Sequence, residues 1–73
     1  MNRIAEDILY EIYHATSTGG YISMDELQTL TGLRGSVIQA EAETMKESGY
    51  LFERECGYQI SEYGSAFSRS RWV

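Results

Sequence analysis

Residues 47–64 read ESGYLFERECGYQISEYG, in which two short apolar runs lie on either side of a Cys-Gly break. Alternation of apolar and polar side chains over residues 50–55 and 58–61 predicts two antiparallel strands. Cys56-Gly57 would form the turn between them, because glycine tolerates a positive φ. The strand residues expected to face the core are Leu51 and Ile60.

A final helix is expected directly after this hairpin. Ser61 is placed to cap it, since a serine hydroxyl can accept a hydrogen bond from a backbone amide of the first turn. Helical periodicity then places four side chains on one inward face, namely Tyr63, Ala66, Phe67 and Ser70.

A longer helix is expected just before the hairpin, over residues 36–48. Ser36 and Gln39 have the spacing of a capping box at its start, and Gly49 would end it. The inward stripe at positions i, i+4 and i+7 is Ile38, Ala42 and Met45. The outer face would present Ser36, Gln39, Ala40, Glu43, Thr44 and Glu47.

The first part of the chain predicts a helix, a short strand and a second helix. Residues 2–15 carry a wide apolar arc that includes Ile4, Ala5, Ile8, Leu9, Ile12, Tyr13 and Ala15. Residues 21–23 form an extended piece, and Ser23 with Glu26 matches a capping box for a short helix that ends at Gly32. The inward residues of that short helix would be Met24, Leu27 and Leu30.

Length and composition indicate one small domain over residues 1–73. One cysteine and one histidine are too few for an internal disulfide or a structural zinc site, and a reducing, cytoplasmic setting fits best. No apolar run approaches the ~18 residues of a membrane span. No phosphate-binding loop or nucleophile–base pair is present in the sequence, so we expect neither an enzyme nor a cofactor.

Charge is the strongest argument against nucleic acid. The net charge is −5, whereas proteins that bind nucleic acid usually neutralise phosphates with cationic side chains. Four arginines nevertheless lie at residue 34 or later, while the first 33 residues hold five acidic side chains and only Arg3. The positions of these charges in the fold would therefore decide whether the protein can bind nucleic acid.

Three strings resemble consecutive segments of winged helix-turn-helix transcription regulators of the MarR, PadR and ArsR type. Residues 22–27 with 31–33, ISMDEL and TGL, are similar to the first helix of the motif. Residues 45–51, MKESGYL, resemble the step out of the recognition helix, and residues 58–64, YQISEYG, resemble the string after the wing. The resemblance implies a mainly α fold with a small β-hairpin, in the order helix, strand, helix, helix, strand, strand, helix.

By this resemblance, the protein would be a small sequence-specific regulator of transcription that binds double-stranded DNA. Helix 36–48 would enter the major groove, and residues 50–61 would form a short wing. The residues expected to contact DNA are Arg34, Ser36, Gln39, Ala40, Glu43 and Arg54. A homodimer through helix 2–15 or the C-terminal helix would align two such helices with two half-sites.

The alternative is a winged-helix module for protein–protein interaction that does not bind DNA. The outer face of helix 36–48 has no Lys or Arg, and Glu43 and Glu47 would face phosphates in a deep groove. A neutral or negative surface over this helix and the hairpin would favour the protein-binding reading. An arginine-lined rim would favour DNA.

Overall fold

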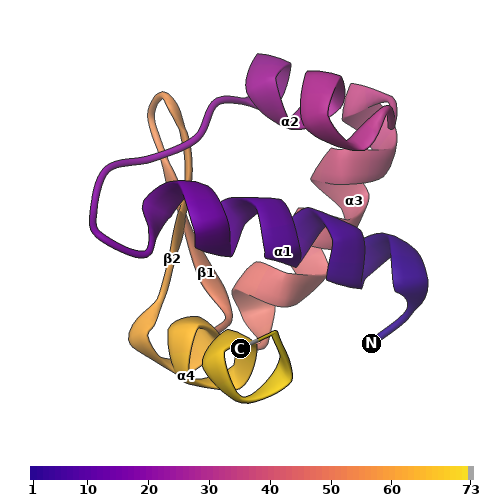
Figure 1. Cartoon of the computed structure of the whole chain (residues 1–73). Helices are drawn as coiled ribbons and strands as arrows, with labels where there is room; N and C mark the ends of the chain where they lie inside the picture. The colour runs from indigo at the N-terminus through magenta and orange to yellow at the C-terminus, as the bar shows by residue number, and fades with distance from the viewer. Residues whose placement is uncertain (73) are drawn as a thin grey trace.

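The computed structural model describes residues 1–72, which form four helices and one two-stranded antiparallel sheet (Figure 1). The elements are α1 (Arg3–Thr16), α2 (Met24–Thr31), α3 (Gly35–Glu47), β1 (Leu51–Arg54), β2 (Gly57–Ile60) and α4 (Glu62–Arg71). The expected mainly helical α+β class is confirmed. Among residues 1–72, no helix is long and apolar enough to cross a membrane.

Helix α1 crosses the middle of the molecule and contacts α2, α3, β2 and α4 (Figure 1). Its residues Ile8, Leu9 and Ile12 are fully buried because apolar side chains recur on one face of the helix. The remaining core side chains converge on them from the other elements, and the expected Ile38, Ala42, Met45, Leu51 and Ile60 are all among them.

The hairpin is shorter than the alternation predicted. Register pairs Leu51 with Ile60 and Arg54 with Gly57, so the turn consists of Glu55 and Cys56, and the expected Cys56-Gly57 turn is wrong. Gly57 has a different role, since a Cβ there would lie 2.0 Å from the carbonyl oxygen of Ile22. Its missing side chain lets β2 approach the segment before α2.

That segment contributes only one bridge in place of the expected short strand. Ile22 and Tyr58 form an isolated antiparallel bridge, with both N–H···O distances at 2.9 Å. These two bonds join the chain before α2 to the hairpin, which fixes the position of α2 relative to the hairpin.

Four of the predicted helix-end residues are confirmed and one is wrong. Gly49 follows the end of α3 with φ 85°. Ser23 accepts from the Glu26 amide at 3.1 Å, and Gly32 ends α2 with φ 72°. Ser61 accepts from the Gly64 amide at 2.9 Å and so caps α4. Ser36 is not a cap, because α3 already begins at Gly35 with Arg34 as its N-cap residue and no side-chain capping bond.

Helical periodicity overestimated the width of the buried faces. Leu30 is 54% exposed, so its predicted inward position is wrong. Ile4, which is 40% exposed, and Ala15 lie on the apolar arc of the first helix but outside the core. In α4, Tyr63, Ala66 and Ser70 are exposed, and only Phe67 of the predicted face is partly buried. The fully covered positions of α4 are Gly64 and Ser68.

The predicted inward face of α4 is mostly exposed because α4 approaches the start of the hairpin very closely. A Cβ at Gly64 would lie 2.0 Å from the carbonyl oxygen of Tyr50, so a larger residue would push α4 away. Close approach selects small residues on the contact line, and the large aromatic residues of α4 lie beside that line. A hydrophobicity pattern therefore points to the wrong face of this helix.

Candidate functional site

The six residues predicted to contact DNA are all exposed, and four of them lie on α3. Ser36, Gln39, Ala40 and Glu43 share its outer side, because they follow one another at helical spacing. Arg34 precedes this helix as its N-cap residue, and Arg54 ends β1. The structure therefore presents the predicted surface to solvent.

A shallow groove of about 310 Å³ lies between the start of α2, α3 and the hairpin. Gln39 and Arg54 both line it, so these two predicted residues meet in one hollow. Glu53 and Glu55 also line this groove, together with Tyr58. Arg34 and Ser36 are not part of the groove. Carboxylates thus outnumber cations in the groove where α3 and the hairpin face each other.

Lys46, which the sequence did not single out, joins α3 to the hairpin. Its Nζ donates to Oε1 of Glu43 at 3.1 Å and to Oε1 of Glu53 at 2.9 Å. These bonds, first to Glu53 and then to Glu43, raise the pKa of Lys46 above its ordinary value. The Glu43–Lys46 spacing of three residues indicates a helical ion pair. The contact with Glu53 depends on the tertiary fold and has no local signal.

Arg54 is held on the hairpin itself. Its Nε and Nη2 donate to Oε1 of Gln59 at 3.0 and 2.9 Å, and its guanidinium lies 5.1 Å from the ring centroid of Phe52. Alternate strand residues point to opposite faces. Glu53 therefore turns toward α3, where it meets Lys46, while Phe52 and Arg54 lie on the opposite face of β1.

Charge is distributed unevenly between two parts of the fold. Residues 17–61, which include α2, α3 and the hairpin, carry seven acidic and three basic side chains, a net charge of −4. The other residues carry four acidic and three basic side chains, a net charge of −1. Two of the three cations in residues 17–61 are Lys46 and Arg54, which already have partners. The surface of α3 and the hairpin therefore carries a net negative charge, and its two arginines, Arg34 and Arg54, are outnumbered by carboxylates.

The ionisation of Tyr58 reflects this negative environment. Burial raises the pKa of Tyr58 above its ordinary 10.0, the charges of Glu53 and Glu43 raise it further, and Lys46 opposes them. The carboxylates of Glu53 and Glu43 raise the pKa of Tyr58 because their negative charges act on its hydroxyl. The groove side of the hairpin is thus a poor place for another anion.

Replacing Tyr58 by phenylalanine tests this environment. A raised pKa in the folded state means that the neutral hydroxyl contributes stability below pH of about 10, and that this contribution is lost as the pH rises through the folded-state pKa. We expect the free energy of unfolding of Tyr58→Phe to fall less steeply than that of the unmodified protein above pH of about 10. Urea denaturation from pH of about 8 to 11 measures this, and parallel curves would contradict it.

Within residues 1–72, no group of three His, Cys, Asp or Glu side chains is arranged to hold a metal ion. The surface formed by α3 and the hairpin is exposed and acidic, and Lys46 links the two elements through its bonds to Glu43 and Glu53. No protein-family model, no curated protein and no solved structure matches the chain.

Proposed function

We propose that the protein is a winged-helix interaction module whose α3 and hairpin bind a basic segment of a protein partner. The observation that carries this proposal is the net charge of −4 on residues 17–61, where two of three cations are already engaged with neighbouring side chains. A Lys- or Arg-rich segment would find carboxylates there without displacing existing contacts.

The order of elements supports a winged helix-turn-helix fold for this module. Helices α2 and α3 are separated by only three residues and contact each other, and the hairpin follows α3 directly. The Ile22–Tyr58 bridge adds a third extended segment beside the hairpin. In such a fold, α3 and the hairpin form one continuous surface for a macromolecular partner.

Two exposed carboxylates on this surface could bind a cationic partner. Glu47 on α3 and Glu55 at the hairpin turn are exposed and make no side-chain hydrogen bond to residues 1–72. Exposed charge pairs are weak individually and are screened over about 10 Å at 0.1 M salt. Binding through them should therefore be of moderate affinity and strongly dependent on salt.

DNA remains the second candidate, favoured by the first two turns of α3. Gly35, Ser36, Gln39 and Ala40 are small or uncharged, which would permit close approach to a groove, and Gln39 could pair with adenine. Arg34 lies directly before them. The acidic surroundings oppose this candidate, because phosphate contacts supply most of the non-specific affinity for DNA.

One titration separates the two candidates. A fluorescent Arg- and Lys-rich peptide and a random-sequence duplex pool are each titrated with the protein at low salt, and bound duplexes are selected and sequenced. We expect the peptide to bind with a Kd of about 10 µM and to lose roughly tenfold in affinity at high salt. We expect no sequence to be enriched from the duplex pool.

Matched variants locate the binding surface. Glu47→Gln with Glu55→Gln removes two charges from α3 and the hairpin, and should weaken peptide binding about fivefold or more. Glu11→Gln with Glu62→Gln removes the same charge from α1 and α4, and should leave the affinity nearly unchanged. Equal losses in both double variants, or no peptide binding at about 100 µM protein, would refute the proposal.

Enrichment of duplex sequences would instead support the DNA candidate. In that case Gln39→Ala should change the preferred sequence, because it removes a base contact. Arg34→Ala should weaken all sequences alike, because a phosphate contact carries no sequence information.

A further inference from the structure

Lys46 occupies a special position on the surface that the proposed function assigns to a basic partner. Of the three cations in residues 17–61, only Lys46 forms a salt bridge with the described residues. Its Nζ lies 3.1 Å from Oε1 of Glu43 on α3 and 2.9 Å from Oε1 of Glu53 on β1. Two carboxylates from different elements therefore face a single point, and an ammonium group of the same chain fills that point.

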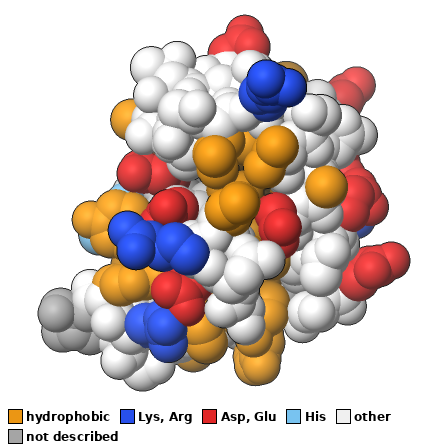
Figure 2. Space-filling model, turned by 90° about the vertical axis from the view of Figure 1, so that its right-hand side faces the viewer, with side chains coloured by type: hydrophobic (Ala, Val, Ile, Leu, Met, Phe, Trp, Pro, Cys, Tyr) orange, Lys and Arg blue, Asp and Glu red, His pale blue; other side chains and the backbone are white. Residues whose placement is uncertain are grey.

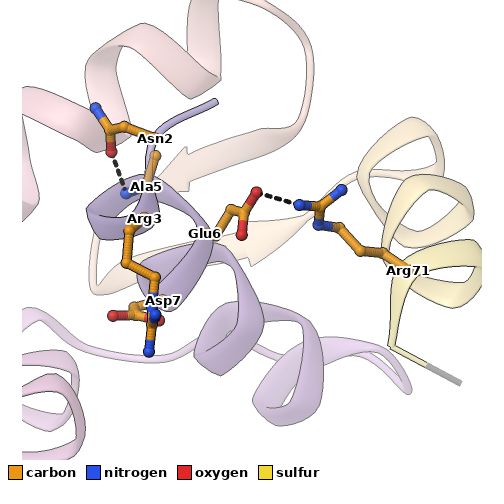
Figure 3. Close-up of polar contacts among 6 residues, drawn as sticks. All are labelled: Asn2, Arg3, Ala5, Glu6, Asp7 and Arg71. Carbon is orange, nitrogen blue, oxygen red and sulfur yellow. Dashed lines mark hydrogen bonds and ion pairs between the residues drawn. The ribbon is translucent and has the colours of Figure 1, made fainter.

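The other ion pairs among residues 1–72 involve one carboxylate each and lie outside this surface. Arg71 of α4 reaches Glu6 on α1, and Arg3 pairs with Asp7 one turn later on α1 (Figure 3). In Figure 2, basic side chains at the lower left lie among acidic ones, whereas acidic side chains dominate the right edge. Lys46 is thus the cation that neutralises carboxylates where the partner is proposed to bind.

We propose that Lys46 is an internal competitor of the basic partner, so that its ammonium leaves Glu43 and Glu53 when a cation of the partner binds them. This inference rests on the proposed function and adds the residue that limits its affinity. Together the three side chains carry a charge of −1, whereas the two carboxylates alone carry −2. A partner meets the full attraction of the pair only when Lys46 has turned away.

The contacts of Lys46 are of the kind that another cation can replace. The side chains of Lys46, Glu43 and Glu53 are 37%, 48% and 46% exposed. Ion pairs at such exposure are weak, because water screens the charges and two long side chains lose freedom. Glu53 also lines the groove of about 310 Å³ between α3 and the hairpin, so a side chain that enters this groove can reach its carboxylate.

Arginine is the cation best suited to replace Lys46. An ammonium has three N–H donors, and Lys46 donates once to each carboxylate. A guanidinium has five donors in a planar fork, can bond two carboxylates from different edges and is less strongly hydrated. An Arg-rich peptide is therefore the appropriate probe of this competition.

Lys46→Met tests the inference, because methionine keeps much of the side-chain stem and removes the charge. A fluorescent Arg-rich peptide is titrated with each protein at low salt, after circular dichroism has shown that each is folded. We expect Lys46→Met to bind about fivefold more tightly than the unmodified protein, with a Kd of about 2 µM in place of about 10 µM.

Two controls separate competition from a simple change of charge. Arg34→Met removes one cation from the same surface but frees no carboxylate, since the Arg34 side chain makes no hydrogen bond to residues 1–72. Arg71→Met frees the Glu6 carboxylate on α1, outside the surface. Each control should change the Kd by less than about twofold. A gain in either control as large as that of Lys46→Met would overturn the proposal.

Glu53→Gln, made with and without Lys46→Met, shows whether the gain comes from the freed carboxylate. Competition predicts that the loss of affinity caused by Glu53→Gln is about threefold larger when Lys46 is absent, because only then is the carboxylate free for the peptide. Equal losses in the two backgrounds would mean that Lys46 acts through long-range charge alone, which would rule out competition.

Failure of this inference and failure of the proposed function give different results. Equal affinities for the unmodified protein and Lys46→Met would overturn the competition and leave the proposed function in place. Absence of binding to both at about 100 µM protein would overturn both. NMR of the unmodified protein gives a test that needs no variant, since saturating peptide should shift the side-chain signals of Lys46. Unchanged Lys46 signals in a saturated complex would show that the ammonium does not leave.

Discussion

Gly57→Ala is expected to lower the free energy of unfolding by about 3–5 kcal/mol. A domain of this size is typically stable by roughly 4–11 kcal/mol, so this loss would be a large fraction of the total. Two independent causes act at this residue, its backbone conformation and its contact with Ile22.

The backbone of Gly57 has φ 154°, a conformation essentially restricted to glycine, and alanine there costs about 1–3 kcal/mol. An added Cβ would also lie 2.0 Å from the Ile22 carbonyl oxygen and 2.7 Å from its carbon, so the two segments would have to separate. Separation breaks both hydrogen bonds of the Ile22–Tyr58 bridge, each worth about 1 kcal/mol.

Gly20→Ala is the matched control for this variant. Gly20 has φ 83°, but nothing lies within 4 Å of a Cβ built there, so only the conformational cost of about 1 kcal/mol is expected. Thermal and urea denaturation followed by circular dichroism give both values. Similar losses for the two variants would mean that the close approach of Gly57 to Ile22 contributes nothing.

Features decided within a few residues could be predicted from the sequence. Ser23 and Ser61 cap helices because their hydroxyls reach amides three residues later, and Gly32 ends a helix because its own φ is positive. The stripe of α3 and the two inward strand residues follow from helical and strand periods alone. None of these depends on where another element lies.

Features that depend on the distance between elements could not be predicted. Gly64 and Ser68 are covered because α4 lies close to the Tyr50 carbonyl, and nothing in their own sequence indicates that approach. Leu30 is apolar and has the correct period, yet α2 presents it to solvent, where it is 54% exposed. Periodicity gives the direction of a side chain around the helix axis, but not whether a neighbour covers it.

The candidate site also combines features that local sequence predicts with features that depend on tertiary contacts. Exposure of the outer face of α3 follows from its period, and the sequence predicted it correctly. Its electrostatics depend on tertiary contacts, since Lys46 meets Glu53 only because β1 lies beside α3. Arg54 likewise has a partner in Gln59 only through the register of the hairpin. Counting charges along the chain therefore overestimated the cations that a partner could contact.

Thr16 makes contacts that the sequence did not predict. The predicted first helix stops at residue 15, yet Thr16 is the last residue of α1 and is 2% exposed. Its Oγ1 donates to the Ile12 carbonyl at 2.7 Å and accepts from the buried Ile60 amide at 2.8 Å. This is a side-chain connection from α1 to β2 at the end of the hairpin opposite Gly57.

Thr16→Val is therefore expected to lower the free energy of unfolding by about 2–3 kcal/mol, because valine has nearly the same shape but leaves the buried Ile60 amide without an acceptor. Hydrogen exchange of the Ile60 amide should also become faster, since the end of β2 loses its link to α1. Thr29→Val controls for the helix, because the exposed Thr29 hydroxyl donates to Asp25 in the same way but accepts from no amide. Its effect should stay within about 0.5 kcal/mol. Equal losses for the two valine variants would mean that the Thr16 hydroxyl stabilises only its own helix and does not hold the hairpin against α1.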